Sequence, residues 1–236
     1  MILFVSGTDT GIGKTRVACA LVRDLVRRGR PVGVMKPIAT GAIRRGGRAL
    51  SADAWSLLRA ARLSISEYGR VNPVLLDPPI SPHLAIRLAR RRMPFRGLRT
   101  RLYNMERRYG LVIVEGIGGV ATPLSDRVTW SDFMASFKNP VTILVCAPRV
   151  GTLNHTLLSI EYLSRRGVTC GFLAISNYRD SDLHHRQNRR ELARWTGLPV
   201  VVCRRGSGRL TGCMHEACRR VGLLESVSWR RPPKCR

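Results

Sequence analysis

The stretch that decides the fold is Gly7-Thr8-Asp9-Thr10-Gly11-Ile12-Gly13-Lys14-Thr15. It follows a short apolar run at residues 2–6 and precedes residues 15–28, whose apolar side chains recur at helical spacing. A glycine-rich loop between a strand and a helix is typical of phosphate binding, because its backbone N–H groups can approach phosphate and the helix N-terminus adds partial positive charge. Lys14 is expected to reach the outer phosphates, and the Thr15 hydroxyl to ligate Mg²⁺. Five residues separate Gly7 from Gly13, whereas the generic pattern has four.

The rest of the chain alternates apolar runs with amphipathic stretches. We predict further strands at residues 31–35, 111–114, 141–147, 171–176 and 198–202, and further helices at 51–62, 96–108, 154–166 and 181–195. Continuous apolar strands separated by helices predict a parallel sheet that is covered on both faces. The expected fold is therefore α/β: a doubly wound, mostly parallel sheet of the P-loop NTPase type, with residues 1–236 forming one domain. Residues 204–236 read as a basic, irregular segment with a short helix near 213–221 and a frayed end at 229–236.

The charge balance is strongly positive. The chain has 41 Lys and Arg against 15 Asp and Glu, a formal net charge of +26. Such a field favours polyanions such as nucleotides or nucleic acid. Because the arginines are scattered along the chain, we favour the alternative of compositional drift toward arginine without a nucleic-acid partner. Only four of the basic residues are lysines, so the lysines at positions 14 and 36, inside the two clearest motifs, are informative.

Several classes of protein are disfavoured. No run of about 18 uncharged apolar residues is present, so no membrane association is expected. The N-terminus lacks the basic region and the long apolar core of a signal peptide. Seven irregularly spaced cysteines match no common zinc pattern and indicate reduced thiols. These features predict a cytoplasmic protein.

Polar residues follow two further predicted strands. Lys36 opens the segment Lys36-Pro37-Ile38-Ala39-Thr40-Gly41, and Glu115 follows the apolar run at 111–114. Because the carboxyl ends of parallel strands open onto one crevice, Lys36 would place a second cation beside the phosphates, and Thr40 a directional hydrogen bond. Glu115 is positioned to help bind Mg²⁺, and Asp53 would complete the set with Thr15. An Asp in a first helical turn is also ordinary helix-dipole chemistry, so that alternative stays open for Asp53.

The order and spacing of eight motifs resemble the dethiobiotin synthetase family over about residues 2–177. The motifs are GTDTGIGKT (7–15), KPIATG (36–41), the helix of Asp53, NP (72–73), SPHLA (81–85), VEGIGG (114–119), TPLSD (122–126) and GTLNHT (151–156). The family's phosphate loop has the same five-residue gap. The resemblance implies a ligase that uses ATP and Mg²⁺ to condense 7,8-diaminononanoate with CO₂ to dethiobiotin. It implies a carbamate, then a carbamic-phosphoric anhydride, with release of ADP and phosphate.

The resemblance also implies roles for individual residues. The catalytic residues would be Lys36, Lys14 and Thr10. The nucleotide would contact Thr10, Gly11, Ile12, Gly13, Lys14, Thr15, Arg16, Glu115, Gly116, Gly118 and Asn177, the last at the adenine. The substrate would contact Lys36, Thr40, Ser81, Gly118, Gly151, Thr152 and Asn154. The metal ligands would be Thr15, Asp53 and Glu115. The family forms a homodimer in which the segment of Gly151, Thr152 and Asn154 comes from the other subunit and holds the substrate carboxylate.

The chain departs from the family's pattern after Asn177. The family usually has a Gly-Glu-Ile-Pro-like segment near the last strand, which contributes to the adenine pocket. Here the corresponding stretch is Val200-Val201-Val202-Cys203-Arg204-Arg205, with neither Glu nor Pro. The sequence therefore leaves the base preference open, as well as whether Arg204 or Arg205 contacts phosphate or base.

Two other functions match parts of the sequence. A ParA-like, nucleic-acid-associated ATPase shares the expected architecture, and the charge favours it. However, its phosphate loop carries an early lysine that residues 9–13 lack, and KPIATG and SPHLA have no role in partitioning. An amidoligase-like relative acting on a corrin-type acid would carry an extra glutaminase domain, for which 236 residues leave no room.

Overall fold

A seven-stranded sheet forms the centre of the molecule. The computed structural model describes residues 1–223, and the strand order is β11-β10-β9-β8-β1-β7-β2. Every neighbouring pair is parallel except β10–β11. The strands are β1 (Ile2–Gly7), β2 (Gly33–Met35), β7 (Val112–Glu115), β8 (Val141–Cys146), β9 (Thr169–Tyr178), β10 (Val200–Arg204) and β11 (Leu210–Gly212). The predicted mostly parallel sheet is confirmed.

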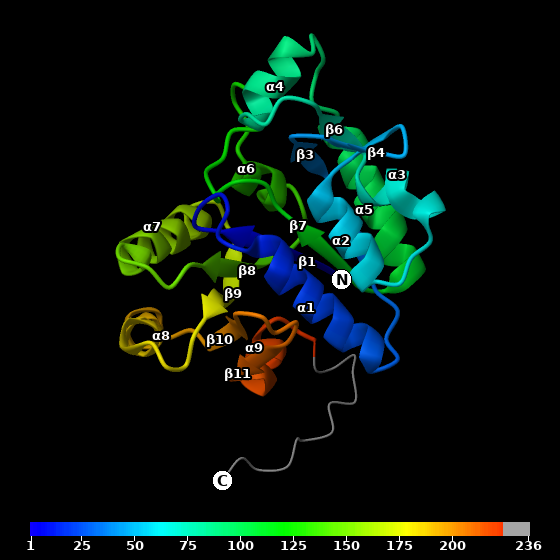
Figure 1. The fold of residues 1–236 in the computed structure, drawn as a ribbon. Helices are drawn as coiled ribbons and strands as arrows, with labels where there is room; N and C mark the ends of the chain where they lie inside the picture. Colours follow the sequence, from blue (N-terminus) through cyan, green and yellow to red (C-terminus); the bar gives the residue numbers. More distant parts are fainter. Residues whose placement is uncertain (224–236) are drawn as a thin grey trace.

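Helices cover both faces of this sheet (Figure 1). On β1, Leu3 and Val5 pack into one core and Phe4 into the other, because successive side chains of a strand point to opposite faces. The first core is closed by α1 (Lys14–Arg27), α2 (Ala52–Ala60) and α9 (Met214–Arg220). The second is closed by α4 (Pro82–Leu88), α5 (Phe95–Tyr109), α6 (Trp130–Ala135), α7 (Thr152–Ser164) and α8 (Leu183–Thr196).

Six short elements lie between β2 and α4, and the sequence predicted none of them. They are β3 (Ile38–Thr40), β4 (Ile43–Arg45), β5 (Arg48–Leu50), η1 (Ile65–Glu67), α3 (Tyr68–Val71) and β6 (Val74–Leu76). Each is only three or four residues long, too short for a periodic pattern to stand out. The expectation of an irregular segment before residue 213 was wrong at β11, which pairs with β10 and so extends the sheet. The predicted frayed end at 229–236 lies outside the described residues.

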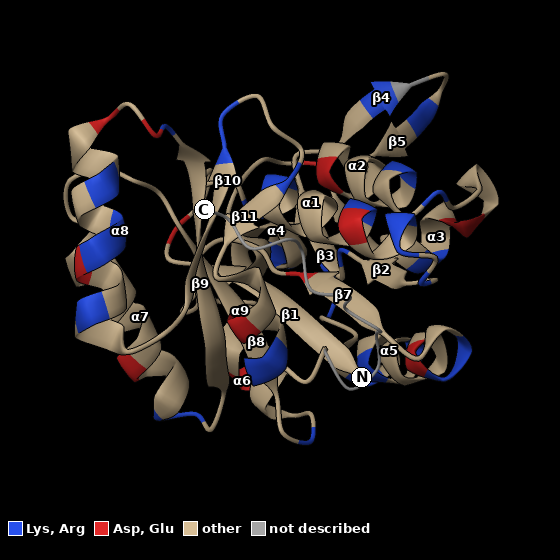
Figure 2. Ribbon diagram, turned by 90° about the horizontal axis from the view of Figure 1, so that it is seen from below, with Lys and Arg blue, Asp and Glu red and all other residues tan. Residues whose placement is uncertain are grey.

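Basic residues are spread over the molecule. Figure 2 shows Lys and Arg along α8 at one side of the molecule, on α1 near its middle and on α2 toward the other side. Among residues 1–223, this distribution matches the scatter of basic residues along the sequence. Within residues 1–223, no helix has both the length and the apolar character needed to cross a bilayer.

Candidate active site

The phosphate-binding motif forms the turn between β1 and α1, as predicted. Gly13 caps α1 with φ +94°, and a Cβ there would lie 2.8 Å from the Ser176 side chain, so both the backbone conformation and the space require glycine. The Lys14 ammonium donates a hydrogen bond to the Asp9 carbonyl at 2.7 Å, which fixes the lysine across the loop. A glycine-rich loop that ends at a helix N-terminus presents N–H groups and positive charge to an anion.

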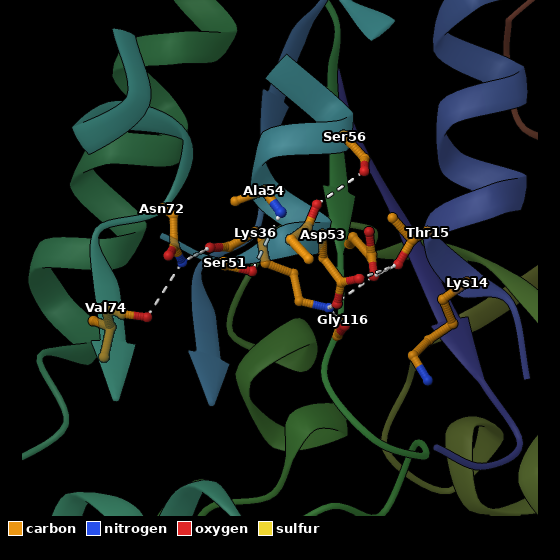
Figure 3. Close-up of polar contacts among 12 residues, drawn as sticks. Lys14, Thr15, Lys36, Ser51, Asp53, Ala54, Ser56, Asn72, Val74 and Gly116 are labelled. Carbon is orange, nitrogen blue, oxygen red and sulfur yellow. Dashed lines mark hydrogen bonds and ion pairs between the residues drawn. The ribbon is translucent and has the colours of Figure 1, made fainter. Parts of the chain in front are cut away.

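Lys36 lies at the centre of a buried polar cluster (Figure 3). Because Met35 of β2 pairs with Val114 of β7, the next residue on each strand, Lys36 and Glu115, emerge side by side. The Lys36 ammonium lies 2.7 Å from Glu115 Oε1 and 3.0 Å from Asp53 Oδ2. It also donates a hydrogen bond to the Gly116 carbonyl at 2.8 Å.

The pKa values of the two lysines at this site shift in opposite directions. Burial alone would lower the pKa of Lys36, but the carboxylates of Glu115 and Asp53 outweigh it and raise that pKa, so the ammonium stays charged. Burial, followed by the nearby charge of Lys36, lowers the pKa of Lys14 to about 8. Burial likewise raises the pKa of Glu115, against the attraction of Lys36. Of these two lysines, Lys14 is therefore the one that loses its charge at the lower pH, near 8.

Side-chain oxygens from three elements meet beside Lys36. Thr15 Oγ1, at the start of α1, lies 2.8 Å from Asp53 Oδ1 and 2.7 Å from Glu115 Oε1. Asp53 is in the first turn of α2, which Ser51 caps by accepting a bond from the Ala54 N–H. Glu115 Oε2 is buried and has no hydrogen-bond partner within the described part of the chain. An orphaned buried carboxylate oxygen beside two further oxygens fits a small, hard cation such as Mg²⁺.

Most of the predicted residues line one pocket of about 350 Å³, hereafter the phosphate pocket. Ala39 and Ile117 add apolar wall that sequence reasoning did not single out. The predicted residues in its lining are Thr10, Gly11, Gly13, Lys14, Thr15, Lys36, Thr40, Asp53, Glu115 and Gly118.

Other predicted residues lie outside the phosphate-pocket lining. Ile12 is buried in the core, and Gly116 contributes its carbonyl to Lys36. Ser81 occupies the N-cap position of α4 without a capping side-chain hydrogen bond, and its hydroxyl lies 2.9 Å from His83 Nδ1. Gly151, Thr152 and Asn154 lie at the start of α7, with Thr152 buried and the other two exposed.

Arg16 and Asn177 line a second pocket, of about 450 Å³, hereafter the basic pocket. Arg16 donates a hydrogen bond to Asn177 Oδ1 at 2.6 Å, which joins the start of α1 to the end of β9. Of the other lining residues, sequence reasoning had considered only Arg205, although Arg179, Asp182 and His185 follow Asn177 within eight positions and are ionisable. The other lining residues are Pro148, Arg179, Asp182, His185 and Arg205.

The sequence left open whether Arg204 or Arg205 contacts the nucleotide, and the two side chains have different surroundings in the structure. The Arg204 guanidinium pairs with the Asp180 carboxylate and donates to the Thr211 hydroxyl. Arg205 lines the basic pocket. Of the two, Arg205 is therefore the one positioned to meet a ligand.

Comparisons with known proteins show which family the chain resembles. A family model described as an AAA domain matches residues 2–204. The chain is 41% identical over 179 residues to the ATP-dependent dethiobiotin synthetase BioD of Aromatoleum aromaticum, covering 72% of this chain and 76% of the relative. It is 38% identical over 168 residues to the enzyme of the same name from Halalkalibacterium halodurans, covering 70% and 67%.

The solved structures agree at the level of the fold. The signal recognition particle receptor FtsY from Elizabethkingia anophelis, in complex with GDP, gives a TM-score of 0.52 at 14% identity, over 98% of this chain and 64% of that one. A GTPase from Pyrococcus abyssi gives 0.50 at 17% identity, over 80% and 72%. At such identities the likeness concerns the P-loop fold alone, and the assignment rests on the sequence relatives. Because these relatives are 41% and 38% identical over two thirds or more of both chains, the chain belongs to the dethiobiotin synthetase family.

Proposed function

We propose that the protein is an ATP-dependent cyclo-ligase that converts 7,8-diaminononanoate and CO₂ to dethiobiotin. The observation that carries this proposal is the placement of Lys36. Its ammonium is buried and charged, and it lies in the same pocket as the phosphate loop and the carboxylates of Asp53 and Glu115. A fixed cation there suits a reaction in which an anionic carbamate must approach an anionic triphosphate.

The proposed reaction begins at one amine of the substrate, which attacks CO₂ and loses a proton to give a carbamate. A carbamate oxygen attacks the γ-phosphorus of ATP and ADP leaves, which forms a carbamic-phosphoric anhydride. The second amine attacks the carbonyl carbon, phosphate leaves, and a proton is released as the ring closes. None of these steps needs a side-chain nucleophile, and the phosphate pocket is lined by lysines, hydroxyls, carboxylates, glycines and two apolar residues.

Lys14 and Lys36 would neutralise the charge that moves during phosphoryl transfer. Lys14 crosses the phosphate loop, so it would contact the β- and γ-phosphates, and Lys36 would lie between the γ-phosphate and the carbamate. The hydroxyls of Thr10 and Thr40 lie in the same lining and would orient the carbamate by hydrogen bonding. Fixed charges placed in advance lower the barrier because they need no reorganisation during the reaction.

Thr15, Asp53 and Glu115 would hold Mg²⁺, with the unpartnered Glu115 Oε2 as one available ligand. When bound, the ion would draw charge from the β- and γ-phosphate oxygens. Lys36 would favour the ionised form of both carboxylates, the form able to ligate, because it lies within 3.0 Å of each.

We further propose that the active enzyme is a homodimer. Gly151, Thr152 and Asn154 lie outside the phosphate-pocket lining of their own chain, as expected if they serve a partner subunit. Exposed apolar side chains flank this segment: Val150 is 99% exposed and Leu158 is 62% exposed. Burial of such side chains between two copies would remove apolar surface from water.

The proposal is tested by incubating the purified protein with 7,8-diaminononanoate, bicarbonate, Mg²⁺ and a nucleoside triphosphate, followed by mass spectrometry. Dethiobiotin is expected from the wild type and from Lys138→Ala, a control at an exposed lysine. It is expected to be absent with Lys36→Ala. Folded wild-type protein that makes no dethiobiotin with any of the four common nucleoside triphosphates would refute the function.

A further inference from the structure

The phosphate pocket and the basic pocket lie on opposite sides of β1 at the carboxyl edge of the sheet. The phosphate pocket takes Lys36 and Glu115 from the ends of β2 and β7, on one side of β1. The basic pocket takes Pro148, Asn177 and Arg205 from just beyond β8, from β9 and from just beyond β10, on the other side. Arg16, which lines the basic pocket, directly follows Thr15, which lines the phosphate pocket.

This arrangement sets the direction of a nucleotide bound across the phosphate loop. The proposed reaction requires the γ-phosphate near Lys36 and the oxygen ligands, on the β7 and β2 side. An extended triphosphate that follows the loop therefore carries its nucleoside toward β9 and β10. The basic pocket is the cavity there, and about 450 Å³ is ample for a purine base.

The side chains of the basic pocket offer hydrogen-bond donors more readily than acceptors. The guanidinium groups of Arg16, Arg179 and Arg205 can only donate. Asp182 is occupied, because one of its oxygens accepts from the N–H groups of His184 and His185 and the other lies 3.4 Å from His185 Nε2. Asn177 Oδ1 already accepts from Arg16.

Arg205 is the donor best placed to read a base. Among residues 1–223, no partner for its guanidinium is found, and its backbone N–H donates to the Tyr178 carbonyl at 3.0 Å, which fixes the chain at the pocket wall. Its neighbour Arg204 is held by Asp180 instead. A guanidinium pairs bidentately with the O6 and N7 acceptors of an oxopurine, whereas adenine offers N7 beside an N6 amino donor.

The resemblance already places the base beside Asn177, in the basic pocket; we propose that Arg205 there selects for a base bearing a ring carbonyl, so that a 6-oxopurine nucleotide supports the reaction more efficiently than the ATP of its relatives. This inference rests on the proposed function for the direction of the nucleotide. It assigns base selection to a residue next to the last parallel strand, where the chain departs from its family.

The test compares ATP with inosine triphosphate, which carries a 6-oxo group in place of the 6-amino group. One bidentate arginine–base pair is worth about 1–3 kcal/mol, so kcat/KM for inosine triphosphate is expected to exceed that for ATP by roughly 10-fold. Arg205→Gln is expected to reduce this ratio to about 1. The control Arg209→Gln changes an exposed arginine outside the basic-pocket lining and is expected to leave the ratio unchanged.

Equilibrium binding of the same two nucleotides separates this inference from the proposed function. If no dethiobiotin forms with either nucleotide, the function fails, while a binding ratio near 10 that Arg205→Gln abolishes would still support the base pocket. A preference for ATP, or a ratio that Arg205→Gln leaves intact, would overturn the role of Arg205 even in an active enzyme.

Discussion

Replacing Lys36 by Met removes the ammonium while keeping the length of the side chain, and leaves Glu115 buried without its cation. The Glu115 side chain is 1% exposed and its carboxylate lies 2.7 Å from the ammonium, so solvent screens this pair very little. Loss of one partner from a buried ion pair typically costs about 3–5 kcal/mol. Asp53 is 45% exposed, so water screens its share of the interaction.

Protonation of Glu115 should limit the loss of folding stability in Lys36→Met. Burial already raises the pKa of Glu115, and without Lys36 that pKa would rise further, since the favourable charge is gone. An acid whose pKa is higher in the folded state than in the unfolded state makes stability fall as pH rises above the unfolded pKa. We therefore expect a loss of about 3 kcal/mol at pH 7, near the lower end of the range for a broken buried pair, and a smaller loss at pH 5.

Thermal unfolding measures this effect directly. For a chain of this size, about 3 kcal/mol lowers Tm by roughly 6–12 °C. The fold should survive because domains have about 5–15 kcal/mol in total. The double variant Lys36→Met with Glu115→Gln should recover most of the loss, and Lys138→Met should change stability by less than about 0.5 kcal/mol. A single variant as stable as wild type, or a double variant as unstable as the single, would refute the buried pair.

Three further predictions concern the site and the assembly. The pKa of Lys14 is about 8, so this lysine loses its charge above that pH. We therefore expect kcat/KM for the nucleotide to fall above pH 8, and Lys14→Arg to remove that fall. Because the pKa is lowered in the folded state, the free energy of unfolding should rise between about pH 8 and 10.5, which urea unfolding would measure. Glu115→Gln should raise the Mg²⁺ concentration needed for half-maximal turnover at least 10-fold, and an unchanged titration would contradict its role as a ligand. The wild type should scatter light as a dimer and Leu158→Glu as a monomer, whereas a monomeric, active wild type would contradict the shared site.

Local pattern was sufficient for the six parallel strands of the sheet and for most helices, although α4 and α6 were not predicted. The phosphate loop, the apolar strands and the capping Ser51 each depend on neighbours in sequence, so composition and spacing determine them. The short elements between Ile38 and Leu76 and the strand β11 could not be predicted. They are stabilised by pairing with distant strands or by packing, rather than by their own periodicity.

By itself, the sequence determined which residues carry charge and hydroxyl groups at the strand ends, and hence the phosphate loop, Lys36 and Glu115. Only the tertiary structure decided how they meet. The pairing of β2 with β7 brings Lys36 and Glu115 within 2.7 Å although they are 79 positions apart in sequence. The order of strands places Arg205 at a pocket on the far side of β1. Strand order arises from burial of the two apolar faces of the sheet, which depends on the whole chain at once and is not visible in any single motif.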